Sequence, residues 1–167
     1  MNPVRIGIMG SKFAASFHTE VWQMLPGAEV VAMAARNPAQ RETFQKKYGI
    51  PKGYALLPEL LADPDVEVVD ICLPNYLHAD AAIKAMEAGK DVICEKPFAT
   101  TLQDGEKVVE VQQKTGRRLF YAEDWIFAPA LLRAEQILKE GGIGKPFYFK
   151  GKETHNGSHS PYAQTIQ

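Results

Sequence analysis

The stretch VRIGIMGSKFAA, residues 4–15, decides the fold. Its first half is a short run of apolar and β-branched residues, which is typical of a buried strand, and the run ends at Gly10. Apolar residues with helical spacing then extend from Phe13 to Leu25 and stop at Pro26-Gly27. A strand, a glycine turn and a helix in this order predict the opening of a βαβ unit with parallel strands.

The same alternation continues along the chain. We expect further strands at 29–33, 52–54, 67–73, 91–94, 118–122 and 147–150, and helices at 38–48, 57–62, 76–88, 102–115 and 129–140. Asn37 and Thr101 stand where helix N-caps are needed, with Asp104 as the capping-box partner of Thr101. The near-continuous apolar runs at Val68 and Val92 fit strands that are buried on both faces. The pattern predicts an α/β fold with a doubly wound parallel sheet of the Rossmann type.

Composition excludes several classes of protein. The chain has 167 residues, and 19 Lys and Arg residues against 20 Asp and Glu residues give a net charge of −1. This balance argues against a non-specific nucleic-acid or anionic-membrane binder. No apolar run approaches the roughly 18 residues that span a bilayer, and the N-terminus lacks a signal-peptide layout. The length fits one domain, or one domain and part of a second.

Cysteine and histidine usage points to a reduced compartment without a metal centre. Cys72 and Cys94 both lie in apolar, strand-like runs, so we expect reduced core thiols in a cytoplasmic protein. The histidines, which are His18, His78, His155 and His159, form no ligand-spaced cluster with the cysteines. We therefore predict no metal site.

Residues 10–15 match part of the dinucleotide fingerprint G-x-G-x-x-G/A. Gly10 takes the first position and Ala15 is an accepted third, while Lys12 stands where the second glycine is expected. The amides at the start of the following helix can receive a phosphate. The candidate phosphate-binding residues are Gly10, Ser11, Lys12, Phe13 and Ala14. The alternative is an ordinary strand–turn–helix with a solvated lysine.

The end of the second strand favours NADP over NAD. The fingerprint places an acidic residue there to hold the ribose 2′-hydroxyl, whereas this chain has Ala34-Ala35-Arg36. An arginine without a neighbouring carboxylate suits a 2′-phosphate. The alternative is that Arg36 is a surface residue beside the Asn37 cap.

Further candidate site residues follow the later strands, where open α/β sheets bind their ligands. They are Leu73, Pro74, Asn75 and His78 after the fourth strand, Glu95, Lys96 and Pro97 after the fifth, and Asp124 and Trp125 after the sixth. Lys96 is the candidate catalytic residue, because an ammonium group at a strand end can stabilise negative charge on a substrate oxygen or relay a proton. Taken alone, Glu-Lys-Pro is also common as a surface tripeptide, and Asn75 and His78 suit a turn and a helix start.

Taken together, these segments resemble the Gfo/Idh/MocA family of NAD(P)-dependent oxidoreductases. The resemblance rests on residues 4–18, 73–78, 94–97, 123–130 and 141–146, in the order that the family has. It implies that Gly10 to Ala15 wrap the pyrophosphate and that Ala35 and Arg36 face the adenosine ribose.

The resemblance also implies roles around the nicotinamide. Pro74, Asn75 and His78 would line the ribose and nicotinamide side, and Glu95 and Lys96 would belong to a motif whose lysine lies near the nicotinamide and the substrate. Asp124 and Trp125, after Glu123, would stand near the nicotinamide end. Pro97 would follow a cis peptide bond.

Family members are roughly twice as long, with a second α/β domain that supplies the substrate pocket. We therefore expect residues 1–122 to form a dinucleotide-binding domain, and 123–167 to form the crossover helix and first strand of an incomplete C-terminal domain. Residues 147–152 match that first strand, and His155 and His159 match the loop after it.

The sequence leaves three functions open. The first is an NADP-preferring oxidoreductase acting on a small sugar-like or cyclitol substrate, with Lys96 assisting the hydroxyl proton. The second is a dinucleotide-binding module that binds without turnover and is completed by another half, which is the behaviour we expect of these 167 residues alone. The third is a structural partner that has lost cofactor binding and docks, or self-associates, through the strand at Phe147.

Overall fold

The computed structural model describes residues 2–152, which belong to two compact units. The first unit ends at Ala122 and the second begins at Glu123. Within the described range, no helix combines the length and the apolar character needed to cross a bilayer.

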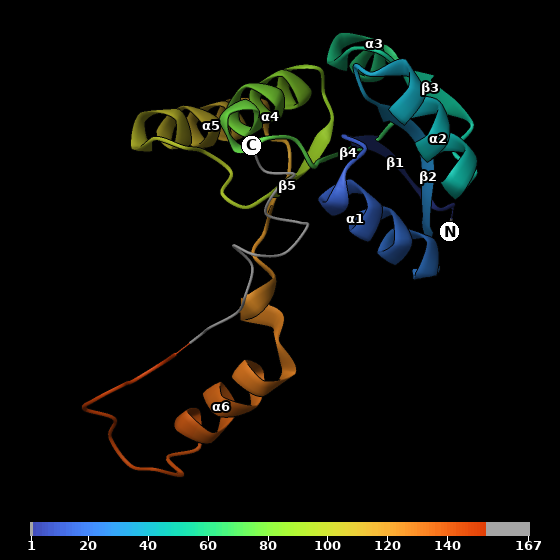
Figure 1. Cartoon of the computed structure of the whole chain (residues 1–167). Helices are drawn as coiled ribbons and strands as arrows, with labels where there is room; N and C mark the ends of the chain where they lie inside the picture. The colour runs from blue at the N-terminus through green and yellow to red at the C-terminus, as the bar shows by residue number, and fades with distance from the viewer. Residues whose placement is uncertain (1, 153–167) are drawn as a thin grey trace. The chain divides into compact units, whose positions relative to one another are not determined.

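The first unit is a six-stranded parallel sheet with helices between its strands (Figure 1). Its strands are β1 (Val4–Met9), β2 (Ala28–Ala34), β3 (Lys52–Tyr54), β4 (Val68–Ile71), β5 (Asp91–Glu95) and β6 (Leu119–Ala122). Its helices are α1 (Phe13–Met24), α2 (Pro38–Tyr48), α3 (Leu57–Ala62), α4 (His78–Glu87) and α5 (Leu102–Thr115). The strand order β3-β2-β1-β4-β5-β6 is the doubly wound order of dinucleotide-binding folds. The predicted fold class is confirmed.

Two layers of apolar side chains hold the helices to opposite faces of this sheet. On one face, Ala15 of α1 and Phe44 of α2 pack with Ile6 and Ile8 of β1. The other face buries side chains of α3, α4 and α5, which are Leu60, Ala81, Ala82, Ala85, Met86, Val108 and Val111. Successive side chains of a strand alternate between the two layers, which explains why the central strands are apolar at nearly every position.

Local capping signals fix the helix ends where the sequence predicts them. The Asn37 side chain accepts a hydrogen bond from the Gln40 amide (3.0 Å), so α2 begins directly after it. The Thr101 hydroxyl oxygen accepts from the Asp104 amide (3.1 Å) and caps α5. The Asp104 carboxylate accepts from the Thr101 hydroxyl (2.7 Å) and not from its backbone amide, so the reciprocal bond of a capping box is absent from this pair.

The helix expected over 76–88 begins later than predicted. Residues 75–77 form a tighter 3-10 turn, η1 (Asn75–Leu77), because the Leu77 amide donates to the Pro74 carbonyl (2.9 Å) three residues back. The α-helix α4 therefore starts at His78, which places this side chain at the junction of the two elements.

The second unit contains a 3-10 helix, η2 (Asp124–Phe127), and α6 (Pro129–Lys139). The strand predicted at 147–150 is wrong, because residues 146–152 have no regular secondary structure. A strand needs a neighbour for its backbone N–H and C=O groups, and no segment within residues 2–152 pairs with this one. His155 and His159 lie outside the described residues.

Gly10 lies where the ends of three strands converge. Its amide donates to the Ala34 carbonyl at the end of β2 (2.9 Å), and its φ of +115° is a backbone conformation that L-residues rarely adopt. A Cβ at this position would collide with the carbonyl oxygen of Cys72, just after β4. Close backbone approach within the protein is therefore sufficient to require glycine here.

We expect Gly10→Ala to lower the free energy of unfolding by about 3 kcal/mol or more, since backbone strain adds to a collision with main-chain atoms. Gly49→Ala is the matched control, because Gly49 also has a positive φ (67°) but an added Cβ would meet nothing within 4 Å. That control should lose only about 1–2 kcal/mol. Urea unfolding measures both variants, and equal losses would contradict the proposed collision.

Candidate functional site

Because the strands are parallel, their carboxyl ends lie along one side of the sheet, called the carboxyl edge here. Most of the predicted site residues lie along this edge. Gly10 follows β1, Ala35 follows β2, Leu73 lies two residues beyond β4, and Lys96 follows β5. The chain runs from β1 outward to β2 and β3 and returns to β4 on the other side of β1, so the strand order reverses between β1 and β4. A crevice at this switch point is the usual ligand site of an open α/β sheet. The predicted residues Asp124 and Trp125 belong to the second unit, in η2.

Charged side chains are paired with one another at the amino ends of the strands, called the amino edge, but two cations are exposed at the carboxyl edge. At the amino edge, Arg118 binds Asp91 (2.6 Å), and Arg5 pairs with two acidic side chains. At the carboxyl edge, Arg36 and Lys96 are exposed, and neither side chain makes a hydrogen bond or ion pair within residues 2–152. Within the part of the chain that the structure describes, these two cations are therefore available to an anionic ligand at the carboxyl ends of the strands.

The predicted phosphate loop leads directly into α1. Lys12 is exposed and occupies the N-cap position, where no side chain caps the helix, and the first turn of α1 contains no acidic residue. The first turn of this helix thus adds no negative charge of its own to the partial positive charge of the helix N-terminus. The Ser11 hydroxyl lies 3.5 Å from Gln40 Oε1 of α2. A surface pocket of about 390 Å³ adjoins the loop and is lined by Ser11, Ser16, Ala39, Gln40, Thr43, Phe44 and Lys47.

His78 joins the two loops that follow β4 and β5. Its ring is buried, and the two nitrogens lie 2.7 Å from the Pro97 carbonyl oxygen and 2.6 Å from the Leu73 carbonyl oxygen. Because carbonyls only accept hydrogen bonds, a ring N–H donates in these contacts, and which nitrogen donates depends on the tautomer. The sequence predicted His78 as a residue that lines a cofactor, and that role stays a prediction. In the structure its ring links the loops that carry Pro74, Asn75 and Lys96.

Lys96 is exposed, while the residues on either side of it make hydrogen bonds. Glu95 Oε2 accepts the backbone amide of Lys96 (2.8 Å), and the Pro97 carbonyl accepts from His78. The Lys96–Pro97 peptide bond is cis, as the family resemblance implied. The tripeptide is thus held on both sides of Lys96, and the ammonium group projects from a fixed backbone.

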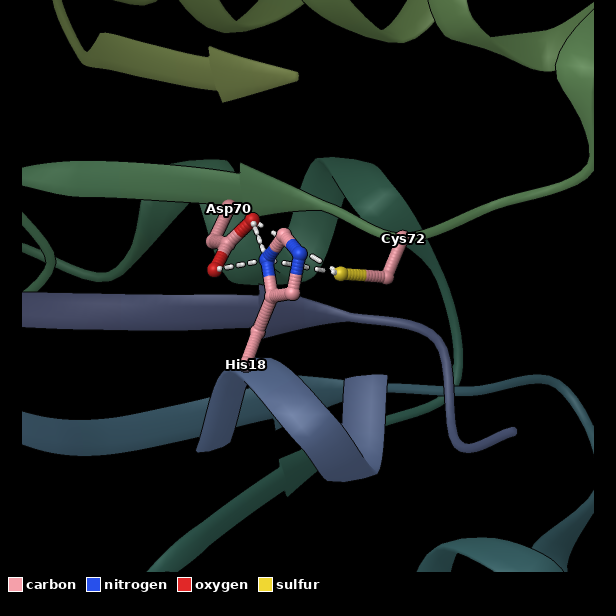
Figure 2. Close-up of side chains that lie close together, drawn as sticks. All are labelled: His18, Asp70 and Cys72. Atoms are coloured by element: carbon pink, nitrogen blue, oxygen red, sulfur yellow. Dashed lines mark hydrogen bonds and ion pairs between the residues drawn. The ribbon is translucent and has the colours of Figure 1, made fainter. Parts of the chain in front are cut away.

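A cluster that the sequence analysis missed lies beneath this edge. Figure 2 shows the His18 ring of α1 between the Asp70 carboxylate of β4 and the Cys72 sulfur. His18 Nδ1 is 3.0 Å from both Asp70 carboxylate oxygens, and His18 Nε2 is 3.3 Å from Glu95 Oε1. Trp22 Nε1, one turn further along α1, also donates to Asp70 (2.6 Å). The Asp70 side chain is completely buried, so these donors take the place of the hydrogen bonds that water would otherwise make to its carboxylate.

Charge within this cluster shifts the ionisation of its members. Burial lowers the pKa of His18, but hydrogen bonds and charge from Asp70 and Glu95 outweigh it and raise the pKa to about 10. Burial raises the pKa of Glu95, but hydrogen bonds from His18 and the Lys96 amide lower it more. Burial and the nearby carboxylates raise the pKa of the Cys72 thiol well above its ordinary value.

The ligand atoms of His18, Asp70 and Cys72 lie within 4.8 Å of one another, a spacing that a metal ion would accept. Within the described residues these groups contact one another. Cys72 Sγ lies 3.5 Å from His18 Nδ1 and 3.6 Å from Asp70 Oδ1, and both histidine nitrogens face carboxylates, so the cluster forms a hydrogen-bonded network.

One feature of the sequence indicates that Asp70 belongs to such a network. Asp70 interrupts the apolar run 68–73, and a carboxylate in a strand buried on both faces must have a donor nearby. Nothing in the spacing of residues identifies His18 or Glu95 as the partners.

Comparisons with known proteins agree with this geometry. The model of the Gfo/Idh/MocA group, described as an oxidoreductase family with an NAD-binding Rossmann fold, matches residues 4–123. Inositol 2-dehydrogenase of Salmonella typhimurium is 34% identical over 98% of this chain and 49% of its own length. The chain spans about half the length of the curated relatives it matches.

Solved structures give the same picture. An NAD-binding oxidoreductase from Klebsiella pneumoniae matches with a TM-score of 0.80 and 34% identity, over 86% of this chain and 40% of that one. An oxidoreductase from Agrobacterium radiobacter, solved with NAD+, L-tartaric acid and magnesium, matches with a TM-score of 0.84 and 25% identity, over 87% and 43%.

The His18 network predicts an imidazole that stays protonated through neutral pH. Because the folded-state pKa (about 10) exceeds the ordinary value of 6.5, its contribution to stability is fully present below pH 6.5 and is lost as the pH rises toward 10. An NMR titration of the histidine ring carbons should show one ring that does not titrate between pH 6 and 8. Assignment by His18→Gln identifies the ring, and a His18 midpoint near 6.5 would contradict the ionic network.

Proposed function

The chain belongs to the Gfo/Idh/MocA oxidoreductase family, and on that premise we propose that it binds a nicotinamide dinucleotide along the carboxyl edge of its sheet, as the cofactor-binding half of an oxidoreductase. The observation that carries this proposal is the position of the Gly10 loop and the α1 N-terminus beside the strand-order reversal between β1 and β4, with Lys96 at the carboxyl end of the adjacent strand β5.

The residues at this edge fit such a cofactor. The uncapped start of α1 suits a pyrophosphate, and the candidate contacts are Gly10, Ser11, Lys12, Phe13 and Ala14. Leu73, Pro74 and Asn75 would line the ribose and nicotinamide side, because His78 fixes their loop against that of Lys96. Asp124 and Trp125 are proposed for the nicotinamide end by family resemblance.

We propose NADP as the preferred cofactor. Ala35 and Arg36 follow β2, no carboxylate occupies the position that would hold a ribose 2′-hydroxyl, and the exposed Arg36 guanidinium is not engaged within residues 2–152. The Ala35 carbonyl accepts from Arg41 (2.8 Å), which steadies the backbone beside it. A guanidinium can bind a 2′-phosphate in a bidentate manner.

In the proposed reaction, Lys96 acts on a hydroxyl of a small sugar-like or cyclitol substrate. The nicotinamide supplies the hydride acceptor or donor when bound. Lys96 Nζ would hold the substrate oxygen, stabilise negative charge that develops on it, and relay its proton as the hydroxyl becomes a carbonyl. Hydrogen bonds on both sides of Lys96 keep its backbone in place for this task.

We assign dinucleotide binding to residues 1–122 and the start of a second domain to 123–167. Orienting a substrate and excluding water takes groups on the far side of the nicotinamide, and Lys96 alone cannot supply them. The proposal for this chain by itself is therefore binding without turnover, with a complementing half or a second copy as its partner.

Calorimetric titration with NADPH and then NADH, at one salt concentration, tests the assignment. NADPH should bind more tightly, and Arg36→Ala should weaken NADPH roughly 10- to 100-fold while leaving NADH nearly unchanged, since a charge-assisted contact to the 2′-phosphate is lost. Arg133→Ala in α6 is the control that removes the same charge elsewhere. If neither cofactor binds, the proposal fails, and the alternative of a non-catalytic interaction module takes first place.

A further inference from the structure

We propose that His18 is a positioning residue for Lys96, because it fixes the Glu95 carboxylate that in turn holds the Lys96 backbone amide. The functional importance of Lys96 rests on the proposed function, whereas the chain of contacts stands on its own. Neither the sequence motifs nor the family match assigns a role to His18.

The contacts form one continuous path from the core to the edge of the sheet. Asp70, with no exposed side-chain surface, holds His18 Nδ1 at 3.0 Å. His18 Nε2 then meets Glu95 Oε1 at 3.3 Å, and Glu95 Oε2 accepts the Lys96 amide at 2.8 Å. Each oxygen of the Glu95 carboxylate therefore has a different partner, one in α1 and one in the Lys96 backbone.

The imidazole is suited to this task because each of its nitrogens faces a carboxylate, with the Cys72 sulfur 3.5 Å from Nδ1 as a further neighbour. Carboxylates accept hydrogen bonds, so the two nitrogens must both donate, and the ring carries a positive charge. The raised pKa of His18 agrees with this assignment at neutral pH. Only 15% of the His18 side chain and 22% of the Glu95 side chain are exposed, so water competes weakly for these bonds.

A simpler role for His18 would be to neutralise the buried Asp70. That role predicts loss of stability when His18 is replaced, but it predicts no specific effect at Lys96. The contact with Glu95 separates the two interpretations, because the other oxygen of the Glu95 carboxylate accepts the Lys96 amide. Loss of this contact would leave the carboxylate, and with it the Lys96 amide, without an anchor on α1.

The decisive measurement is the backbone order parameter of the Lys96 amide, from nitrogen-15 relaxation of the whole chain without cofactor. We expect a rigid value of about 0.85 in the unmodified chain and a value below about 0.6 in His18→Gln. The Arg118 amide is the matched control, since it also donates to a carboxylate, that of Asp91 (2.8 Å), and it should not change.

A second variant covers the case in which His18→Gln does not fold because Asp70 loses its cation. Glu95→Gln leaves the Asp70–His18 pair in place and keeps an oxygen for the Lys96 amide, but it loses the charge that holds His18 Nε2. It should also lower the order parameter at Lys96, and the double variant should lower it no further, because both changes break one path. An unchanged Lys96 amide in Glu95→Gln, or additive effects, would overturn the proposal.

Ligand binding separates this inference from the proposed function. In His18→Gln, or in Glu95→Gln if the former is unfolded, affinity for NADPH should fall roughly 3- to 10-fold, while affinity for 2′-phospho-ADP-ribose, which lacks nicotinamide, should not change. An equal loss for both ligands would overturn the inference. If the unmodified chain binds neither ligand, the proposed function fails, and the order parameters still decide whether His18 positions Lys96.

Discussion

A buried carboxylate on the central strand β4 is the constraint on which this structure depends. Asp70 has no contact with water, and leaving such a group unpaired would cost several kcal/mol, so its donors must be fixed in place. Two of them, His18 and Trp22, are one turn apart on α1. Their spacing orients α1 on the sheet and thereby sets the direction in which the Gly10 loop enters the helix.

Two histidines with different partners hold the loops at the carboxyl edge. His18 reaches Glu95 through an ionic contact, and His78 reaches the Leu73 and Pro97 carbonyls through hydrogen bonds from a buried ring. Rigid elements thus carry the loops, while Lys96 and Arg36 keep their charged groups exposed. A binding site needs a fixed backbone and available cations. The conformational entropy of the loops is then lost when the protein folds and not when the ligand binds.

Sequence patterns predicted the first unit well because its elements are defined locally. The Asn37 and Thr101 caps and the glycines after α2 and α5 mark helix ends within a few residues of chain, so the helices at 38–48 and 102–115 have the bounds that were expected. The strand expected at 147–150 does not form, because a strand depends on partners that are distant in the sequence and not on local signals. Aromatic residues favour a strand, but a strand forms only where a neighbouring backbone accepts its hydrogen bonds.

The sequence by itself determined the alternation of strands and helices, the strand-end positions of Gly10, Arg36 and Lys96, and the resemblance that the family match confirmed. Only the tertiary structure decided that His18 meets Asp70 and Glu95, from which it is separated by 52 and 77 positions. Such contacts depend on strand order and on how α1 crosses the sheet, and no local pattern encodes them. The structure likewise decided that His78 links two loops, because its burial and both of its partners arise from packing.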